Sequence, residues 1–482
     1  MKRTIILASV LTLSVIGAGA AYGAAEHQKI TGPFASPMEV TKKCLECHED
    51  AGHDIMQTSH WTWKLQQDYG ERGTVDRGKK NAVNNFCISV NGNWARCTSC
   101  HIGYGWKDAN FDFTDASRID CLVCHDTTGK YKKPGPAAGM PAGYTGNEKF
   151  DKKPVDLVAV AQNIGTPSRD NCIVCHGFGG GGNNVKHGDI DSSMISPSRE
   201  HDVHMDADGQ NFTCQTCHTT EQHQIKGNAM VVSPRGASHL SCTACHDAEP
   251  HGESLLNSHT ERVACQTCHI PTIAKEMPTK LSWDWSAAGE DIQDPPKDDY
   301  GMPTYHKNKG NFVWGKNVVP TYAWYNGKAE SYLLGDRMDP DKVTRLNYPL
   351  GDINDSSAKI YPFKVHTGNQ IYDKQYRYFI TPKLFGSPKD SDAYWVNFDW
   401  DKAAAAGMKT SGLAYSGEYG FAPTAMYWRI NHMVTPADKA LGCLDCHGDN
   451  GRLDWQNLGY NGDPLREKLA AAENKQEGIS MK

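Results

Sequence analysis

The residues with the clearest chemistry are cysteines and histidines in a repeated five-residue pattern. Sixteen of the 17 cysteines fall into eight copies of Cys-x-x-Cys-His. The copies are Cys44/Cys47/His48, Cys97/Cys100/His101, Cys121/Cys124/His125, Cys172/Cys175/His176, Cys214/Cys217/His218, Cys242/Cys245/His246, Cys265/Cys268/His269 and Cys443/Cys446/His447. Two thiols three positions apart on a helical turn reach the two vinyl groups of one porphyrin, and the following histidine lies beneath the iron as an axial ligand. The pattern predicts eight covalently bound haem c groups.

Two other chemistries use paired cysteines, namely a redox dithiol and a zinc site. Neither requires a histidine directly after the second cysteine in every copy. At average residue frequencies one copy of the pattern is already a rare coincidence, so eight copies in one chain are not chance. Haem attachment is the interpretation that fits, and it leaves Cys87 as the one cysteine outside the pattern.

Each haem iron has a sixth position, and a second histidine there gives a saturated, low-spin centre suited to passing electrons. Of the 21 histidines, thirteen lie outside the motifs. We expect eight of these to be axial ligands: His60, His187, His204, His223, His251, His259, His366 and His432. His239 is the reserve, and the sequence does not pair ligands with irons. If all eight irons were saturated by histidine, the chain would be an electron carrier, so an enzyme needs one iron that differs.

Cys87 and Arg96 lie near the second motif in the sequence. With the other cysteines bound to haem, Cys87 is a free thiol in an exported chain. It is either a small buried apolar residue or a thiol beside the iron of the second motif, where it could exchange with sulfur substrates. Arg96 precedes Cys97 and should lie at the rim of that haem, where it binds either a substrate anion or a haem propionate.

A glycine-rich stretch follows the fourth motif and leads to Lys186 and His187. Glycines at 177 and 179–182 allow the backbone to take positive φ and to lie against a flat porphyrin, unless the segment is simply a flexible surface loop. Adjacent side chains point in different directions, so Lys186 and His187 could serve two neighbouring irons. A lysine must lose its proton to bind iron, which burial favours; the alternative is a solvated lysine.

The elements that position these residues must be short. Seven motifs lie between Cys44 and His269, too close together for each to have its own domain, and the chain has 46 glycines, 24 prolines and 39% hydrophobic residues. Porphyrins would supply the buried apolar mass that the sequence lacks. We therefore expect a multihaem cytochrome c fold, with mainly short α-helices and irregular loops wrapped round a haem array, and minor β-hairpins.

The chain divides into four expected regions. Residues 1–25 are an export signal, because Lys2 and Arg3 precede an apolar run over 5–20 and then small residues. The mature protein is then periplasmic, with a heptahaem region including the active-site haem at 26–270, a cysteine-free covering region that supplies haem ligands at 271–440, and the eighth haem with a short tail at 441–482. In the covering region, residues 311–335 indicate a β-hairpin around Asn326-Gly327, and residues 390–409 and 421–434 indicate helices, the second presenting His432.

Long segments of the chain resemble the octahaem tetrathionate reductases, which are related to multihaem nitrite reductases and hydroxylamine oxidoreductases. The resemblance covers nearly the whole mature chain. It rests on NNFCISVNGNWARCTSCHIGYGW, SRDNCIVCHGFGGGGNNVKHGD, DVHMDADGQNFTCQTCH, ERVACQTCHIP, YPFKVHTGNQIYD and INHMVTPADKALGCLDCHGDNGRLDWQNLGY. In that family one haem has a lysine in place of the second histidine, and a free cysteine lies nearby.

The resemblance implies roles for particular residues. Lys186 corresponds to the lysine ligand, the haem of Cys97, Cys100 and His101 to the active haem, and Cys87 to the nearby thiol. Asn183 stands where the family has an acidic residue three positions before the lysine, which puts a proton-transfer role there in doubt. The family's reactions are reductive: tetrathionate to thiosulfate, and nitrite or hydroxylamine to ammonia.

Features of the two related enzyme groups are only partly present. Nitrite reductases carry a Cys-x-x-Cys-Lys motif at the active haem, and none occurs in this sequence. Hydroxylamine oxidoreductases attach a tyrosine near the C-terminus to a haem; Tyr460 lies in a comparable position, although packing or hydrogen bonding is the commoner role of such a tyrosine. Both groups extend into long C-terminal helices, whereas only a short helix after Pro464 is expected here, which favours a monomer.

The sequence thus predicts a periplasmic octahaem oxidoreductase of the tetrathionate reductase type. Haems with two histidine ligands would feed electrons from a periplasmic or membrane-associated donor to the Lys186-ligated haem, where a small sulfur or nitrogen anion is reduced beside Lys186, Cys87 and Arg96. The alternatives are a non-catalytic multihaem electron carrier and a hydroxylamine-oxidising enzyme. A net charge of −6 argues against a nucleic-acid partner.

Overall fold

Two compact units make up the chain in the computed structural model, which describes residues 25–68, 72–230 and 240–480. Among the described residues, unit 1 consists of those within 25–62, 93–172 and 221–224, and unit 2 of those within 63–92, 173–220 and 225–480. The predicted export signal lies outside the described residues, apart from Ala25. Haem motifs occur in both units, and the regions expected at 26–270, 271–440 and 441–482 stay predictions.

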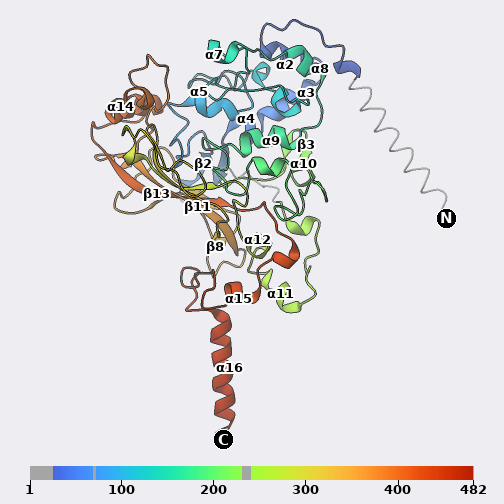
Figure 1. Ribbon diagram of the computed structural model, residues 1–482, viewed down its shortest axis with the longest axis vertical. Coiled ribbons are helices and arrows are strands. Elements are labelled where there is room, and N and C mark those ends of the chain that lie inside the picture. Colours follow the sequence, from blue (N-terminus) through green and yellow to red (C-terminus); the bar gives the residue numbers. More distant parts are fainter. Residues whose placement is uncertain (1–24, 69–71, 231–239, 481–482) are drawn as a thin grey trace, which may run out of the picture. The chain divides into compact units, whose positions relative to one another are not determined.

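Unit 1 is built from short helices joined by loops (Figure 1). Its helices are α2 (Pro37–Leu45), α3 (Glu49–Met56), α4 (Ser59–Thr62), α5 (Trp94–Cys97), α6 (Leu122–His125), α7 (Glu148–Asp151), α8 (Leu157–Gln162) and most of the first turn of α9 (Arg169–His176). Proline at the first position of α2 needs no intrahelical donor, and Asp156 caps α8 by accepting a hydrogen bond from the Ala159 amide. A small core around Val40, Leu122 and Val160 holds them together.

Unit 2 contains a nine-stranded sheet. The strand order is β6 (Tyr305–His306), β7 (Gly310–Gly315), β5 (Thr279–Asp284), β11 (Lys359–Asp373), β13 (Tyr419–Arg429), β10 (Thr344–Pro349) and β9 (Ala329–Ser331), while β8 (Thr321–Tyr325) and β12 (Tyr378–Phe379) also pair with β11. The long antiparallel pair β11 and β13 (Figure 1) keeps one register from Phe363↔Arg429 to Asp373↔Tyr419. This sheet is larger than the expected minor hairpins, although short helices and irregular loops prevail in the rest of the described chain.

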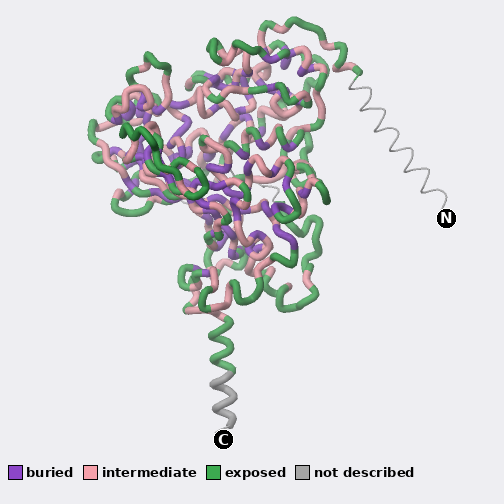
Figure 2. The backbone as a smooth tube through the Cα atoms, in the orientation of Figure 1, coloured by how far each residue is buried: buried purple, intermediate pink, exposed green. Residues whose placement is uncertain are grey.

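The main apolar core lies in unit 2 and involves the sheet and helix α14 (Trp400–Ser411). Asp399 caps the helix by accepting hydrogen bonds from two backbone amides, and Gly412 ends it in the left-handed conformation that glycine adopts without strain. The helix predicted within 390–409 is therefore confirmed in its second half. Figure 2 shows this core as buried backbone, whereas the segment 240–250, which carries the sixth haem motif, is exposed.

Two local predictions for the covering region are wrong. The segment 421–434 is not a helix, because residues up to Arg429 form β13, in which Pro423 lies opposite Asn369 of β11. Proline in a helix interior removes a hydrogen bond and clashes with the preceding turn, while pairing with β10 and β11 satisfies most of the strand's backbone. The turn at Asn326-Gly327 exists, but β8 and β9 pair with β11 and β10 rather than with each other.

The chain ends in helix α16 (Pro464–Ser480), which is longer than the short helix expected after Pro464. Among the described residues, no helix combines the length and apolar character that crossing a bilayer requires.

Candidate haem sites and active site

Each haem motif lies on a single helical turn or at the end of a helix. The turns are the end of α2, α5 with a 3-10 turn (Thr98–Cys100), α6, α9, α10 (Cys214–Cys217), a 3-10 turn (Cys242–Ala244), α12 (Cys265–His269) and α15 (Cys443–Cys446). All 17 cysteines are described, and none forms a disulfide. The motif thiols therefore have the turn-like spacing that two thioether bonds to one porphyrin require.

Two motif cysteines have a particular placement. Cys47 lies just beyond the end of α2 and is exposed, and the backbone leaves the helical conformation by His48 (φ −111°, ψ 55°). Its amide still donates to Cys44 O at 3.2 Å, so the two residues keep the turn that a haem needs.

Cys175 lies inside α9, as its motif predicts. The division between the two units falls within this motif, so that Cys172 belongs to unit 1 and Cys175 to unit 2. The glycine-rich loop also returns to this end of the helix, since a Cβ at Gly179 would lie 3.5 Å from Cys175 O. The thioether bonds of Cys47 and Cys175 stay predictions, which rest on the motif.

Large apolar side chains beside several motifs are exposed to solvent. Leu444, between the two cysteines of the last motif, is 77% exposed, Val174 in the fourth motif is 50% exposed, and Leu255 is 66% exposed. A porphyrin attached at these motifs would cover such side chains, so the surroundings of the cysteines fit haem.

Five motif histidines face another histidine at a uniform distance. The pairs, with their ring-centroid distances, are His27–His48 at 6.1 Å, His204–His246 at 6.1 Å, His218–His432 at 6.3 Å, His251–His269 at 6.1 Å and His259–His447 at 6.3 Å. Two imidazoles on opposite sides of one metal ion, with metal–nitrogen bonds of about 2 Å, have their centroids about 6 Å apart. The five pairs thus have the separation of trans axial ligands.

Two more motif histidines lie close to a second histidine. Burial lowers the pKa of His223, and the nearby His125 lowers it further. Burial likewise holds the pKa of His187 well below its usual value, with further contributions from Lys186 and from His176. His223 therefore lies near His125 in unit 1, and His187 lies near His176 in unit 2.

Several histidines of these pairs are oriented by a hydrogen bond from Nδ1. The acceptors are Gly165 O for His125 (2.9 Å), Lys226 O for His218 (2.9 Å), Asn257 Oδ1 for His251 (3.1 Å), Leu255 O for His259 (2.7 Å), Asp189 Oδ2 for His432 (3.1 Å) and Asp463 Oδ1 for His447 (2.7 Å). A ring whose Nδ1–H donates to an oxygen has the other nitrogen, Nε2, available for a metal.

One buried carboxylate holds the backbone beside two of the paired histidines, His204 and His432. Asp202 is 3% exposed and accepts four backbone hydrogen bonds. Its Oδ1 binds the amides of His204 and Met205, and its Oδ2 binds those of Met433 and Val434. The segments that present His204 and His432 are therefore fixed to one side chain.

The second motif differs from the others. The His101 ring is fully buried, its Nε2 lies 2.7 Å from Trp61 O, and the rings of Trp61, Trp106 and Phe111 surround it. Binding an iron through Nε2 requires a different orientation of this ring from the one recorded.

The motifs of unit 2 follow one another in space. The Cys217 and Cys245 thiols lie close enough for one charge to act on the other, the Cys242 and Cys265 thiols are within hydrogen-bond distance, and Cys268 is similarly close to Cys446. Haems attached at the last four motifs would therefore be neighbours in sequence order, which the sequence alone did not establish.

Six of the eight predicted axial ligands lie beside a motif histidine. His187, His204, His223, His251, His259 and His432 each lie beside a motif histidine. His60 is in α4 and its ligand role stays a prediction, and His239 lies outside the described residues. His27, one of the thirteen histidines outside the motifs, was not among the expected ligands, because its position 21 residues before His48 gives no signal of pairing.

Lys186 and His187 lie against the same aromatic ring in unit 2. The Lys186 Nζ atom is 4.8 Å from the centre of the Trp428 ring, and the His187 ring is 5.2 Å from it at an angle of 70°. Trp428 in turn lies 5.8 Å from Phe86, which precedes Cys87 in the chain. The structure thus gathers Lys186 and the segment of Cys87 around Trp428 and Phe86.

His366 belongs to the same group of side chains. Its ring is fully buried, 4.6 Å from the Phe86 ring, and neither ring nitrogen has a hydrogen-bond partner among the described residues. Burial, and then the charges of Lys364 and Lys280, hold the pKa of His366 well below its usual value. The predicted role as an axial ligand stays a prediction, since this ring contacts Phe86 rather than a motif histidine within unit 2.

Lys280 is a second buried basic group close to Cys87. It is 3% exposed, and its Nζ lies 3.3 Å from the centre of the Phe312 ring and 4.0 Å from that of Trp283. Burial and Lys309 lower its pKa well below the ordinary value, while the Cys87 thiol acts in the opposite direction. No carboxylate among the described residues pairs with Lys280, so this part of unit 2 is suited to an anion.

Three other residues singled out in the sequence have simpler surroundings. Arg96 lies in α5 of unit 1, and its role stays a prediction. Asn183 exchanges two hydrogen bonds with Ser192, at 2.7 and 3.0 Å, and so ties the glycine-rich loop together. Tyr460 packs against Trp455 and Trp324 in a small core, which favours the packing role.

Two family models and one curated relative match parts of the chain. The family described as "Cytochrome c bacterial" matches residues 280–450, and that described as "Cytochrome c7 and related cytochrome c" matches residues 198–270. An uncharacterised protein of Archaeoglobus fulgidus is 25% identical over 277 residues, or 47% of this chain and 91% of that protein.

A solved structure covers almost the whole chain. It is the crystal structure of octaheme cytochrome c from Shewanella oneidensis, which is 56% identical, has a TM-score of 0.84, and is matched over 92% of this chain and 98% of its own. The predicted fold class and the predicted haem c cofactors are thereby confirmed. The chain belongs to the octahaem cytochromes c, the family that its motifs indicated.

Proposed function

We propose that this protein is a periplasmic reductase of small oxidised sulfur or nitrogen anions, with Lys186 as the sixth ligand of the haem of Cys97, Cys100 and His101. The other seven irons would each have two histidine ligands: the five ring pairs, and the pairs His125 with His223 and His176 with His187. In this proposal no iron is left for His60 or His366, so His366 is assigned to the anion site instead. The proposal for Lys186 rests on the resemblance and on its position next to His187 at the Trp428 ring.

The observation that carries the proposal is the group of basic side chains near Cys87 in unit 2. His366 and Lys280 are almost completely buried, and neither pairs with a carboxylate among the described residues. Burying basic groups without acidic partners is costly unless an anion balances them when they are charged. A carrier that only passes electrons would have no need of such a group.

When bound, haem supplies an iron that passes single electrons and can bind a substrate atom at an exchangeable position. The chain's own residues bind and orient the anion: Lys280 and His366 offer donors, and Trp428 and Phe86 exclude water. In the sulfur reaction, tetrathionate takes two electrons from a reduced periplasmic carrier, its central S–S bond breaks, and two thiosulfate ions leave. Cys87 could take part by thiol exchange with the disulfide-like bond.

The test is a substrate panel on the holoprotein with reduced viologen as donor, comparing tetrathionate, nitrite and hydroxylamine. We expect turnover of at least one anion, and a low-spin haem signal distinct from those with two histidine ligands. Lys186→Met should abolish that signal and reduce turnover, whereas Lys152→Met, at an exposed position of unit 1, should change neither.

Three outcomes would contradict parts of the proposal. Eight haems with two histidine ligands each, and no turnover of any anion, would favour the non-catalytic electron carrier. The seven histidine pairs are compatible with that function as well. Oxidation of hydroxylamine without reduction of any anion would favour the hydroxylamine-oxidising enzyme. If Cys87→Ala left tetrathionate turnover unchanged, the thiol role would be lost while the iron's role survived.

Location and partners complete the proposal. An exported c-type cytochrome receives electrons from a periplasmic or membrane-associated donor, and the cleaved signal at residues 1–25 and a monomeric state are part of the same hypothesis. N-terminal sequencing of the mature protein tests the cleavage, with Ala24 or Glu26 expected as the first residue.

A further inference from the structure

Three consecutive carbonyl groups of the loop that carries Lys186 are held by two buried side chains. Lys364 Nζ donates to Val185 O at 2.7 Å and to Lys186 O at 3.1 Å. The hydroxyl of Thr279 donates to Asn184 O at 2.6 Å and accepts a hydrogen bond from Lys364 Nζ at 2.7 Å. We define Lys364 and Thr279 as the carbonyl clamp.

The loop contains no helix or strand, so side chains fix much of it: besides the clamp, Asn183 bonds to Ser192, and the Asn184 side chain donates to Met277 O at 2.6 Å. Between the end of α9 and the 3-10 turn Ser192–Ile195, the backbone takes positive φ at Gly180, Gly181, Asn184 and Gly188. Buried carbonyls outside helices and strands need another donor. Here the donors are side chains of β5 and β11, so the rigid sheet of unit 2 sets the position of the loop.

The carbonyl clamp holds the backbone of Lys186, the proposed iron ligand. Lys364 lies directly opposite Trp428 in the register of β11 and β13, and directly opposite residues of an antiparallel pair lie on the same face of the sheet. Lys364 holds the Lys186 backbone, while Trp428 contacts the Lys186 amine and the His187 ring. Two neighbouring strand positions therefore fix both ends of the Lys186 side chain.

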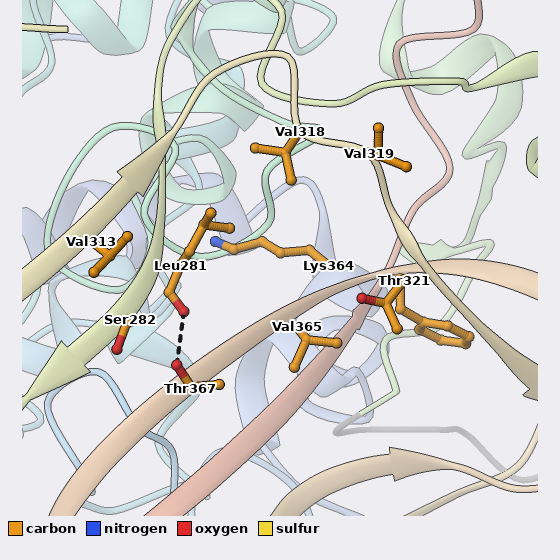
Figure 3. A pocket seen from close by; sticks show the side chains of 10 residues that line it. Leu281, Ser282, Val313, Val318, Val319, Thr321, Lys364, Val365 and Thr367 are labelled. Carbon is orange, nitrogen blue, oxygen red and sulfur yellow. Dashed lines mark hydrogen bonds between the residues drawn. The ribbon is translucent and has the colours of Figure 1, made fainter. Parts of the chain in front are cut away.

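Burying a lysine amine at this place is costly if the contact is purely structural. Lys364 is 1% exposed and Thr279 is fully buried, and the Lys364 side chain lies along an apolar groove of about 340 Å³ beside Leu281 and Val318 (Figure 3). Gly188 lies over its stem, since a Cβ there would be 3.0 Å from Lys364 Cδ. A methionine would fill this apolar space, so stem packing alone does not require a lysine.

We infer that Lys364, with Thr279, is a positioning residue that holds the backbone at Lys186 so that its amine is presented to the iron. This inference rests on the proposed function for the ligation itself. The clamp would keep the Lys186 amine at the position that ligation requires. A misplacement of about 1 Å in a reactive site can lower the reaction rate about a hundredfold.

The experiment uses Lys364→Met in the holoprotein, with Lys275→Met as the matched control. Lys275 Nζ also donates to three carbonyls, Glu200 O, His201 O and Met433 O, at 2.9–3.0 Å, but holds different segments of unit 2. We expect Lys364→Met to lose the low-spin signal that Lys186→Met abolishes, and to bind nitric oxide faster at that haem. Lys275→Met should keep the signal.

A double variant separates positioning from general loosening. In the Lys186→Met background, Lys364→Met should add no further change to the haem spectra. Retention of the lysine-dependent signal in Lys364→Met, or its equal loss in Lys275→Met, would overturn the inference. If Lys364→Met does not fold, Thr279→Val, which keeps the side-chain shape, provides the same comparison.

A second readout separates this inference from the proposed function. Amide hydrogen exchange over residues 184–188 should become faster in Lys364→Met and stay unchanged in Lys275→Met. If Lys186→Met alters no haem signal, the ligation proposal is wrong, and exchange still decides whether the clamp holds the loop. Unchanged exchange in Lys364→Met would overturn the clamp itself.

Discussion

Replacing Asp189 with asparagine should raise the reduction potential of one haem by about 100 mV. Asp189 is 1% exposed, and its Oδ2 accepts hydrogen bonds from the His432 ring at 3.1 Å and from the amides of His432 and Asn431 at 3.0 and 2.8 Å. A carboxylate on the far side of a ligand histidine stabilises the more positive, oxidised iron and so lowers the potential. Asparagine keeps an oxygen acceptor for these donors but removes the charge.

The magnitude follows from the distance and the burial. The carboxylate and the iron would lie on opposite sides of one imidazole ring, about 6 Å apart. At an effective dielectric constant of about 20, unit charges at that distance interact by about 3 kcal/mol. For a one-electron couple, in which about 59 mV corresponds to a tenfold change, this is on the order of 100 mV.

The assay is a spectroelectrochemical titration of the holoprotein, followed by the low-spin signals of the individual haems. Asn257→Asp is the reciprocal variant, because Asn257 Oδ1 accepts from His251 Nδ1 at 3.1 Å and carries no charge. It should lower the potential of the haem of that histidine, by less than the first shift since Asn257 is only partly buried. If Asp189→Asn moved no haem upward, or if both variants moved potentials in the same direction, the electrostatic reasoning would be refuted.

Three further predictions concern stability and ligation. Asp202→Ala should lower the free energy of unfolding by about 3 kcal/mol or more, since four buried amides lose their acceptor; thermal unfolding monitored at the haem bands measures this. Gly188→Ala should destabilise the fold, because φ is +88° and a Cβ would be 2.8 Å from a neighbouring side chain, whereas Gly129→Ala, with φ of +65° and open space, should cost only about 1 kcal/mol. His27→Ala should convert one of eight haems to a high-spin form that binds carbon monoxide, whereas His53→Ala, at a surface helix, should convert none.

The chemistry of this chain could be predicted from its sequence, because haem attachment depends on residues three positions apart. The motif of Cys214, Cys217 and His218 needs only one helical turn, and that turn is present in α10. Ligand pairing could not be predicted, because it depends on residues as distant as His218 and His432, whose approach is set by the whole of unit 2. Local patterns carry no information on such contacts.

The same limit explains the errors in the covering region. The apolar residues of 421–434 fit the spacing of a helix, yet the segment pairs on both sides with other strands, and both faces of the strand bury side chains. Burial on both faces removes the alternation of apolar and polar residues that identifies a strand in a sequence. Pro423 was the local signal against a helix. Lys364 gave no signal at all, because a lysine with a buried amine looks like any solvated lysine until its acceptors are known.

The anchoring of two ligand segments on Asp202 has a consequence for how electrons move. Tunnelling between redox centres falls off steeply with the gap between them, so thermal fluctuations of that gap would make the rate vary from one moment to the next. Because one rigid carboxylate holds the backbones of both His204 and the segment after His432, the two neighbouring centres would shift together rather than apart. Their spacing, and with it the transfer rate, would then stay nearly constant while the surrounding loops move.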